Sequence, residues 1–508
     1  MAARIDMSKI WLLMFGPVIV LVISIIGLFA MQTSVPVYQE TFRPQYHFSP
    51  PEKWMNDPNG LVYFDGEYHL FYQYHPYDVI WGPMHWGHAV STDLVHWENL
   101  PIALEPDDNG TIFSGSAVID VNNTAGFGAN AMVAIYSYNT QTQGVAYSTD
   151  RGRTWTKYAG NPIMPALATP DFRDPKVFWH EESGQWVMVI AAGREAQFYT
   201  SPNLLDWTFA SSFAAGHIVA TWEVPDIFPL DIDGETKWVL LVSVGAYAPA
   251  GGSGIQYFIG DFDGSTFTND NPTGTTLWLD YGADNYAGTT WNDEPNGERI
   301  YIGWLNNWTY ANNIPTSTWR GATTLPRTLR LVNTAEGVRL AQAPVAALES
   351  LRTPLGTWDD LTISSTEQVI DGVAGRTLEI IAEIEPSSAE RWGLKVQRSD
   401  ETGTRIVYSP ARSSLLIGRG DTTSAGPIYS FSPAFGAPLE LNGDTLRLHI
   451  FVDESSVEVF AQDGLVTLTA QTFVEPPANG LSFFADNGDI TVKHLEVYAL
   501  DSIWSAPE

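Results

Sequence analysis

Three short motifs in this chain hold the carboxylate residues best suited to chemistry. They are Trp54–Gly60 (WMNDPNG), Phe172–Pro175 (FRDP) and Trp222–Asp226 (WEVPD). Cleavage of a glycosidic bond needs two carboxyl groups in different protonation states around one sugar carbon, and a third acid can stabilise the charge that develops on the sugar. Each motif alone also fits ordinary structure, because Asp-Pro-Asn-Gly is a strong turn sequence and Arg173 could simply pair with Asp174.

A repeat of five units relates these motifs to one another. A polar or acidic cluster, followed by two short runs of apolar and aromatic residues, begins near residues 57, 115, 174, 226 and 285, so the steps are 58, 59, 52 and 59 residues. Short runs of β-branched and aromatic residues bounded by Gly, Pro, Asn or Asp are strand signals. Four strands in a unit of this length fit one propeller blade, and five units predict a five-bladed β-propeller.

The repeat predicts that carboxylates far apart in the sequence meet in space. Asp57, Asp174 and Asp226 fall at equivalent places, the start of the first strand of their units. The first strands of a propeller line its central channel, so residues that open them converge at one end of the axis. Glu223 precedes its blade position by three residues and is expected to reach the same mouth.

The patterning of the 508 residues predicts an all-β protein with two folded domains. Residues 38–340 hold the repeat, and the alanine-rich residues 341–353 are expected to form a helix-like linker. Residues 354–504 show plain alternation of apolar and polar residues with polar turns, which favours a C-terminal β-sandwich.

An apolar segment precedes these domains. In residues 1–34, basic Arg4 and Lys9 are followed by an apolar run that begins at Ile10 and is long enough to span a bilayer. We interpret this segment as an uncleaved, transmembrane signal anchor that holds the domains outside the cell at its surface. A cleaved signal peptide, and hence a secreted protein, is the alternative.

Composition and charge exclude several classes of partner. The formal net charge of −32 argues against nucleic acid, whose binding needs a basic surface. The 19 tryptophans and 21 tyrosines suit a neutral sugar, because flat rings cover its apolar faces, although most are expected in blade cores. The chain has no cysteine, so thiolate chemistry is impossible. His85 and His88 form an H-x-x-H pair with no third ligand near them in the sequence, so we expect no metal site.

From Tyr38 to about Trp504 the chain resembles glycoside hydrolase family 32, the β-fructofuranosidases that include invertases, inulinases and levanases. It is most similar there to bacterial levanase or fructan β-fructosidase sequences. The strings that carry the resemblance, beside the Trp54 motif, are Tyr46–Pro50, Phe71–Pro76, Trp81–His88, Ile112–Ser116 and Phe451–Phe460. The resemblance implies a five-bladed propeller followed by a β-sandwich, in agreement with the repeat.

The resemblance also implies a role for each residue of the motifs. It makes Asp57 the nucleophile, Glu223 the general acid/base and Asp174 the stabiliser of the transition state, with Arg173 gripping sugar hydroxyls. The expected activity is retaining hydrolysis, with release of terminal fructose from levan, inulin and sucrose. No cofactor or metal is implied. Further positions that match the family's substrate pocket are Asn56, Gln73, Trp81, Phe113, Ser114, Asp226, Trp304 and Asn306.

Two departures from the family pattern affect the expected site. Val224 stands where cysteine is usual, beside the acid/base, and Asn285 stands where an aromatic residue is common. Alternative activities stay open: mainly sucrose hydrolysis, endo-acting cleavage of fructans, or transfer of fructose to an acceptor. More distant alternatives are an inverting propeller glycosidase that acts on arabinan or xylan, and a non-catalytic sugar-binding protein. The sequence leaves the oligomeric state open.

Overall fold

The computed structural model describes residues 37–364, 367–385, 388–419, 430–441, 443 and 445–504. Residues 41–506 form one compact unit, and residues 1–40 with 507–508 form another. Of this second unit, residues 37–40 are described, and they adopt turn and bend backbone. The predicted signal anchor, residues 1–34, lies outside the described residues. Within the described ranges, no helix is both long enough and apolar enough to cross a bilayer.

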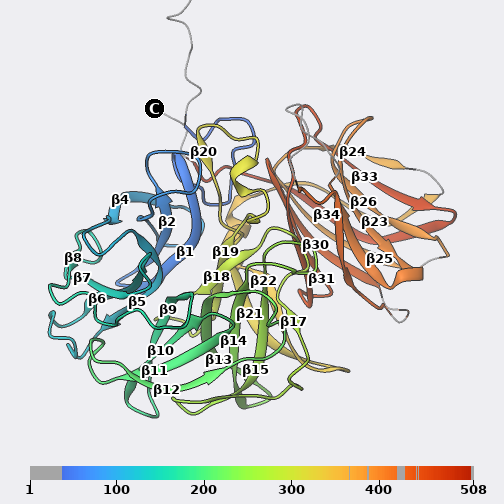
Figure 1. Ribbon diagram of the computed structural model, residues 1–508. Coiled ribbons are helices and arrows are strands. Elements are labelled where there is room, and N and C mark those ends of the chain that lie inside the picture. Colours follow the sequence, from blue (N-terminus) through green and yellow to red (C-terminus); the bar gives the residue numbers. More distant parts are fainter. Residues whose placement is uncertain are drawn as a thin grey trace, which may run out of the picture. The chain divides into compact units, whose positions relative to one another are not determined.

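Five antiparallel sheets occupy the first part of the compact unit (Figure 1). The first contains β1 (Lys53–Phe64), β2 (Glu67–His75), β3 (His85–Ser91) and β4 (Glu98–Leu104), with β20 (Trp319–Arg320) parallel to β1. The second contains β5 (Ile112–Asp120), β6 (Ala131–Tyr138), β7 (Gln143–Ser148) and β8 (Thr156–Lys157). The third contains β9 (Phe172–His180), β10 (Gln185–Ala192), β11 (Glu195–Ser201) and β12 (Thr208–Phe213).

The fourth sheet contains β13 (Trp222–Ile232), β14 (Glu235–Val244), β15 (Gly254–Phe262), β16 (Phe267–Asn269) and β17 (Leu277–Trp278). The fifth contains β18 (Tyr286–Thr290), β19 (Ile300–Trp304), β21 (Arg327–Thr334) and β22 (Gly337–Pro344). The first strands contact one another in the order β1, β5, β9, β13 and β18, and β18 returns to β1. This closed ring is the predicted five-bladed β-propeller.

The turns between strands follow from the local sequence. Asp65–Gly66 joins β1 to β2 with φ values of 48° and 90°, and Asp233–Gly234 joins β13 to β14 with 53° and 85°. Positive φ at both central residues is the two-residue hairpin turn that Asp-Gly favours, because glycine lacks a Cβ and aspartate tolerates the left-handed region. Such tight hairpins place consecutive strands of a blade side by side.

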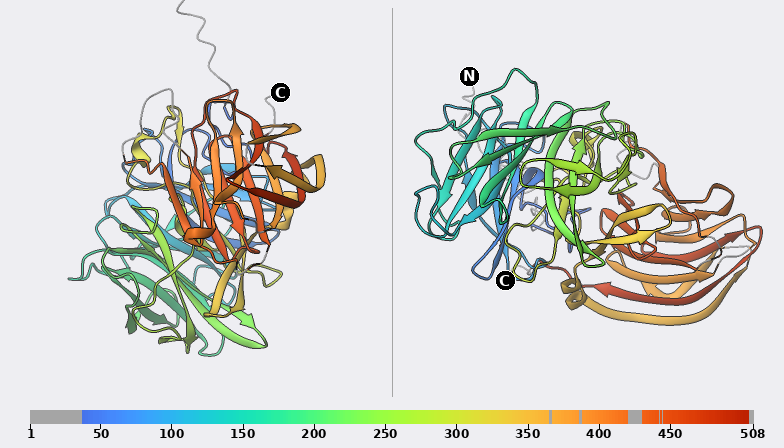
Figure 2. Two further views of the ribbon diagram at one scale, coloured as in Figure 1. Left: turned by 90° about the vertical axis from the view of Figure 1, so that its right-hand side faces the viewer. Right: turned by 90° about the horizontal axis from the view of Figure 1, so that it is seen from below.

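Residues 352–500 form two six-stranded sheets (Figures 1 and 2). One runs in the order β23 (Arg352–Ser364), β34 (Asp489–Leu500), β25 (Leu378–Glu385), β30 (Leu446–Asp453), β31 (Ser456–Ala461) and β32 (Val466–Gln471). The other runs β24 (Gln368–Ala374), β33 (Gly480–Asp486), β26 (Arg391–Arg398), β27 (Thr404–Ser409), β28 (Ser414–Gly418) and β29 (Ala434–Pro438). Alternate residues of both sheets share one buried apolar core, which makes the pair the predicted β-sandwich.

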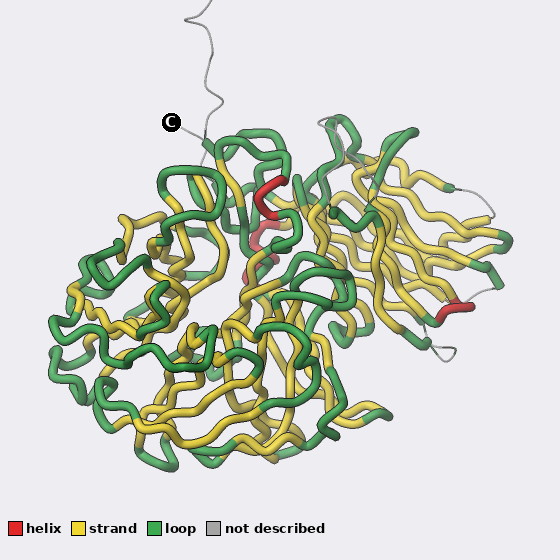
Figure 3. Tube along the Cα trace, in the orientation of Figure 1, coloured by secondary structure: helices red, strands yellow, loops and turns green. Residues whose placement is uncertain are grey.

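The connection between propeller and sandwich differs from the predicted linker. The structure continues β22 to Pro344, forms the 3-10 helix η3 (Ala346–Leu351), and begins β23 at Arg352. Ala341 is fully buried and pairs with Arg330 of β21. Residues 341–344 are therefore strand, because sheet pairing and burial outweigh the weak helix preference of a short alanine-rich stretch. Elsewhere in the described residues, short 3-10 helices are η2 (Ala311–Asn313) and η4 (Pro410–Arg412), as Figure 3 shows.

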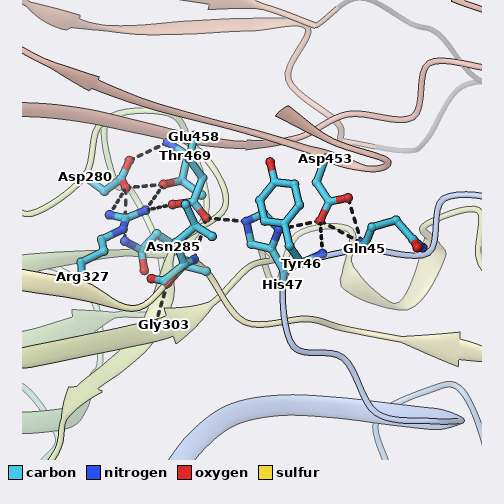
Figure 4. A network of polar contacts seen from close by, with 12 residues as sticks. Gln45, Tyr46, His47, Asp280, Asn285, Gly303, Arg327, Asp453, Glu458 and Thr469 are labelled. Atoms are coloured by element: carbon cyan, nitrogen blue, oxygen red, sulfur yellow. Dashed lines mark hydrogen bonds and ion pairs between the residues drawn. The ribbon is translucent and has the colours of Figure 1, made fainter. Parts of the chain in front are cut away.

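A buried polar network joins the propeller part to the sandwich (Figure 4). His47 Nδ1 lies 2.7 Å from Asp453 Oδ2 of β30, and its Nε2 lies 3.1 Å from Glu458 Oε1 of β31. Arg327 of β21 donates to Glu458 Oε2 at 2.7 Å. Burial lowers the pKa of His47, but hydrogen bonds and charges of Asp453 and Glu458 outweigh burial and raise that pKa to about 9. His47 is thus a cation held between two carboxylates.

Candidate active site

The first strand of every blade contains a β-bulge near its start. Cross-strand pairing shifts between Met55 and Pro58, Ile112 and Gly115, Arg173 and Lys176, Glu223 and Asp226, and Tyr286 and Thr289. A bulge inserts an unpaired residue and redirects neighbouring side chains, and bulges are frequent beside active sites. Hydrogen bonds that link neighbouring blades converge on these five bulges, so residues far apart in sequence share one site.

Asp57, from the bulge of β1, is hydrogen-bonded through both carboxyl oxygens. Ser114 Oγ, from the bulge of β5, donates to Oδ2 at 2.7 Å, and Asn56 Nδ2 donates to Oδ1 at 2.8 Å. Trp54 Nε1 donates to Asn56 Oδ1 at 2.7 Å and so orients the amide. Burial raises the pKa of Asp57 and the charge of Glu223 adds to this, while the bonds from Ser114 and Asn56 favour the ionised form. An oriented, half-buried carboxylate of this kind can act as a nucleophile.

Glu223, from the bulge of β13, is held by two neighbouring blades. Arg173 Nη2 donates to Oε1 at 2.7 Å, and the hydroxyl of Tyr286 donates to Oε2. Arg173 also bonds Asp171, and its Nε lies 3.8 Å from Asp174 Oδ2. Because both oxygens have donors, the carboxyl group of Glu223 has a defined orientation. Its side chain keeps 22% exposure, so a ligand can reach it.

Asp174, from the bulge of β9, is almost fully buried. Its Oδ2 accepts from the backbone N–H of Val224 at 3.1 Å, and its own N–H donates to Ser137 Oγ at 2.9 Å. Burial and the charges of Glu223 and Asp57 together raise the pKa of Asp174 to about 7, against the opposing effect of the Arg173 guanidinium. Asp57, Asp174 and Glu223, three of the four acids that the sequence predicted at one mouth, thus influence one another and form one cluster.

Backbone strain accompanies the cluster. Asp174 has a φ of 67° and Val224 a φ of 44°. The left-handed region is unfavourable for a β-branched side chain, and such strain concentrates at functional sites. Val224, the departure from the family's cysteine, presents its N–H to Asp174 and packs its side chain among buried aromatic residues.

Aromatic side chains form a wall beside the carboxyl groups. Trp54 and Trp304 are fully buried with ring centroids 6.0 Å apart, and Trp308 lies 4.7 Å from Trp304. The same cluster contains Tyr286 and Val224. The predicted residue Trp304 is therefore in the wall next to Glu223, and its indole N–H has no hydrogen-bond partner within the described part of the chain.

The remaining predicted pocket residues divide into two groups. Trp81 is 45% exposed, and its ring lies 6.3 Å from that of Phe113, the neighbour of Ser114 in the β5 bulge. Gln73 lies opposite the β1 bulge, and Asn306 follows β19; both are buried, and neither amide nitrogen has a partner among the residues the structure describes. Asn306 Oδ1 accepts from the N–H of Asn307 at 2.9 Å, and within the described residues Asn306 makes no hydrogen bond to the three acids.

The structure corrects the predicted position of Asp226. In the bulges of β9 and β13, Val224 corresponds to Asp174, and Asp226 corresponds to Lys176. Asp226 is fully buried, lies 3.3 Å from Lys176 Nζ and accepts from the N–H of Thr290 at 2.7 Å. It is thus an interior partner of a buried lysine. The sequence prediction matched Asp226 to Asp174 because both are acidic. Cross-strand register instead matches Asp174 to Val224, two residues before Asp226.

Tyr286 was not predicted, although the repeat contains a signal for it. Arg173, Glu223 and Tyr286 each occupy the last paired position before a bulge. Aligning the blades at their bulges would have brought these three residues together. The departure from the family pattern lies at the neighbouring Asn285, and no motif drew attention to the tyrosine beside it.

A hollow of about 500 Å³ opens beside the ion pair of Glu223 and Arg173. Thr221, Trp308 and the 72% exposed Tyr247 line its other sides. It can accommodate the leaving group of a substrate on the side of Glu223.

Among the described residues, no cluster of three or more His, Cys, Asp or Glu side chains could hold a metal ion. His85 Nδ1 lies 3.0 Å from the carbonyl of Pro83, and His88 lies 3.0 Å from His69 in the blade core.

Comparison with known proteins agrees with this arrangement. Residues 47–344 match the glycosyl hydrolases family 32 N-terminal domain, and residues 347–499 match the glycosyl hydrolases family 32 C-terminal domain. A levanase of Bacillus subtilis (strain 168) is 50% identical over 488 residues, which cover 92% of this chain and 72% of that protein. An extracellular exo-inulinase of Aspergillus awamori is 38% identical over 516 residues, which cover 92% and 96%.

Solved structures show the same architecture. The crystal structure of exo-inulinase from Aspergillus awamori has a TM-score of 0.87 and 37% identity, covering 92% of this chain and 100% of that one. The β-fructofuranosidase from Schwanniomyces occidentalis complexed with fructosyl-erythritol has a TM-score of 0.84 and 31% identity, covering 92% and 99%. Fold and site together define a propeller glycosidase. The chain belongs to glycoside hydrolase family 32.

Proposed function

We propose that this protein is a retaining β-fructofuranosidase that releases terminal fructose from levan, inulin and sucrose. The observation that carries the proposal is the contrast between two carboxyl groups. Asp57 is oriented by Ser114 and Asn56 as a nucleophile, and Glu223 borders the hollow into which a leaving group fits. The relatives named levanase and exo-inulinase support fructans as substrates.

The reaction takes two steps. In the first, a carboxylate oxygen of Asp57 bonds to the anomeric carbon, the bond to the leaving oxygen breaks, and Glu223 gives its proton to that oxygen. In the second, Glu223 takes a proton from water, the water oxygen bonds to the anomeric carbon, and the Asp57 ester breaks. Asp174, in its ionised form, stabilises the positive charge on the sugar, and Arg173 holds Glu223 between these steps.

The pocket residues have assignable parts in this proposal. Asn56 and Ser114 position Asp57, and the buried Gln73 packs opposite the β1 bulge that carries Asp57. Trp81 and Phe113 supply flat apolar surface for a sugar ring, and the fully buried Trp304 packs in the wall behind Glu223. Like Gln73, Asn306 has a buried amide nitrogen without a partner among the described residues, and it makes no hydrogen bond to the acids there. Asp226 is not included among the substrate-binding residues, because its carboxyl group forms an ion pair with the buried Lys176.

The test of Glu223 uses the leaving group. A general acid lowers the barrier only as far as the departing oxygen needs a proton. We expect Glu223→Ala to lose roughly 10²–10⁴-fold in activity on sucrose and fructans. On an activated aryl β-fructofuranoside the first step should survive, visible as a burst of aryl alcohol and as acceleration by azide. Asp174→Ala is the matched control and should show no such rescue. Equal losses of Glu223→Ala on both substrates, with no burst, would remove the acid/base role.

Substrate preference and mode of action need a product profile on levan, inulin and sucrose. Exo action predicts free fructose from the earliest time points, because only a chain end enters the aromatic-walled pocket. Early accumulation of long oligosaccharides would favour endo action, and turnover restricted to sucrose would favour an invertase. Retention is read from the anomeric configuration of the first product, and inversion would point to the arabinan or xylan enzymes.

The place of action is proposed from the apolar segment of residues 1–34 and from relatives described as extracellular. We expect an enzyme anchored at the outer cell surface, and deletion of residues 1–34 should give active enzyme without membrane attachment. Native material found free in the medium, beginning near Gln32, would show instead that the segment is cleaved.

A further inference from the structure

A propeller segment lies along the edge strand of the sandwich. Among the described strands, β32 pairs with β31 alone, so the backbone groups of its other edge need partners from outside the sheet. Residues 280–284, between β17 and β18, satisfy them. The N–H of Tyr281 donates to the carbonyl of Thr467 at 2.9 Å, and the N–H of Asp284 donates to the carbonyl of Thr469 at 3.1 Å.

Two aspartates complete this contact from the propeller side. Asp280 Oδ1 accepts from the N–H of Thr469 at 2.9 Å, and its Oδ2 accepts from Thr469 Oγ1 at 2.6 Å. Asp284 Oδ2 accepts from the N–H of Gln471 at 2.8 Å and from Arg419 Nη1 at 2.6 Å. The edge of β32 is therefore matched by both backbone and side chains of one short segment.

Gly282 allows the two backbones to approach. A Cβ at this position would lie 2.1 Å from both N and O of Thr469, a distance that requires backbone to move. Gly282 has no positive φ that would demand glycine, so the requirement is one of space alone. An alanine here would push the segment away from β32.

The same contact belongs to the buried charge network of Figure 4. Arg327 donates to Asp280 Oδ2 at 3.2 Å, to Thr469 Oγ1 at 2.6 Å and to Glu458 Oε2 at 2.7 Å. Asp280 and Glu458 thus share one fully buried arginine. A buried charge that loses a partner is costly, so this arrangement holds the segment firmly.

The held segment leads directly to the catalytic cluster. Asn285 Nδ2 donates to Asp280 Oδ2 at 3.2 Å, and its Oδ1 accepts from the hydroxyl of Tyr301 at 2.6 Å. The next residue is Tyr286, which donates to Glu223. The asparagine at position 285 thus extends the polar network to the residue beside the tyrosine.

We propose that the C-terminal sandwich positions the proton-donating glutamate, through the segment 280–286 and the hydroxyl of Tyr286. Tyr286 and Gly282 are positioning residues in this inference, which rests on the proposed role of Glu223. Only Asn285 separates Asp284, which is fixed on β32, from Tyr286, so a shift of the segment is transmitted to the hydroxyl. A misplaced hydroxyl leaves Oε2 of Glu223 without its donor, and proton transfer to the leaving group suffers first.

The experiment compares Gly282→Ala with a matched control. Gly274→Ala adds the same methyl group in the loop before β17, where a Cβ meets nothing within 4 Å. Tyr286→Phe removes the hydroxyl alone, and a hydrogen bond to a charged group corresponds to about 10–100-fold in rate. We expect Gly282→Ala and Tyr286→Phe to lower kcat on sucrose by that amount and to act much less on an activated aryl β-fructofuranoside. Gly274→Ala should match the wild type on both.

A double-mutant cycle decides whether the effect passes through Tyr286. In the Tyr286→Phe background, Gly282→Ala should add little to the loss on sucrose, because the contact it disturbs is already missing. Independent, multiplicative losses, or equal losses on both substrates, would overturn the proposal. Thr469→Val keeps the shape of the edge strand and removes the Oγ1 bonds, so it tests the same link if Gly282→Ala does not fold.

Failure of this inference is distinguishable from failure of the proposed function. If Glu223→Ala discriminates between leaving groups and Gly282→Ala does not, the sandwich has no part in positioning the acid. If Glu223→Ala itself shows no discrimination, the role of Glu223 is wrong and the positioning inference falls with it.

Discussion

Arg173 Nη2 of β9 donates a 2.7 Å hydrogen bond to Glu223 Oε1 of β13, across the boundary between two blades. The same guanidinium lowers the pKa of Asp174, which burial and the charges of Glu223 and Asp57 raise to about 7. One side chain therefore orients the acid/base and favours the ionised form of the neighbouring carboxyl group.

Arg173→Gln is expected to shift the pH dependence of the enzyme. Without the guanidinium the pKa of Asp174 rises above about 7. Because the ionised form of Asp174 is the active one, the fall of kcat/KM on the acid side should begin at higher pH than in the wild type. The profile is measured on an activated aryl β-fructofuranoside, where proton donation by Glu223 matters least.

Arg151→Gln is the control for this change. Arg151 forms an exposed ion pair with Asp65, so its replacement should leave the profile unaltered. An acid limb of Arg173→Gln that coincides with that of the wild type would contradict the assigned link between Arg173 and Asp174.

Asp57→Ala is expected to abolish turnover on every substrate, because no fructosyl-enzyme can form. Ser114→Ala should have a graded effect. Loss of the 2.7 Å bond to Oδ2 raises the pKa of Asp57 and lowers kcat, by about 10-fold for one charge-assisted hydrogen bond. Initial rates on sucrose measure both. An Asp57→Ala enzyme that keeps about a tenth of the wild-type rate cannot use Asp57 as its nucleophile.

Asp226→Asn is expected to destabilise the propeller without changing substrate affinity. It leaves Lys176 buried without its carboxylate, and an unpaired buried charge costs about 3–5 kcal/mol. Thermal unfolding measures the loss, and KM for sucrose should stay at the wild-type value. The double variant Lys176→Met with Asp226→Leu should recover part of the stability. A large rise in KM with unchanged stability would return Asp226 to the substrate pocket.

The buried His47 predicts alkaline loss of stability. Its pKa is raised from 6.5 to about 9, so the contribution of the protonated form is complete below about pH 6.5 and is lost as the pH rises through 9. A shift of this size corresponds to a loss on the order of 3 kcal/mol. Urea unfolding between pH 6 and 10 measures it. In His47→Gln this part of the pH dependence should vanish, and an unchanged slope would assign it to other groups.

Short-range patterns account for what the sequence predicted correctly. Strand runs bounded by Gly, Pro, Asn or Asp, recurring with polar or acidic clusters, sufficed for the blades. Alternation sufficed for the sandwich, because each of these strand signals is a property of neighbouring residues. The motifs around Asp57, Asp174 and Glu223 likewise carry their chemistry within a few residues. The folded propeller brings these three motifs together as expected, because five repeated units close into a ring whose first strands lie next to one another.

Tertiary structure alone decided which residues stand at each bulge and what holds them. The position of a bulge depends on cross-strand register, which the acidic residues used to align the repeat do not mark. Asp226 therefore lies in the interior, and Tyr286 contacts Glu223. The link from Thr469 through Asp280 joins residues 189 positions apart. Contacts at such separations arise only when two complete sheets meet, because each partner satisfies a backbone edge or a buried charge that the other exposes.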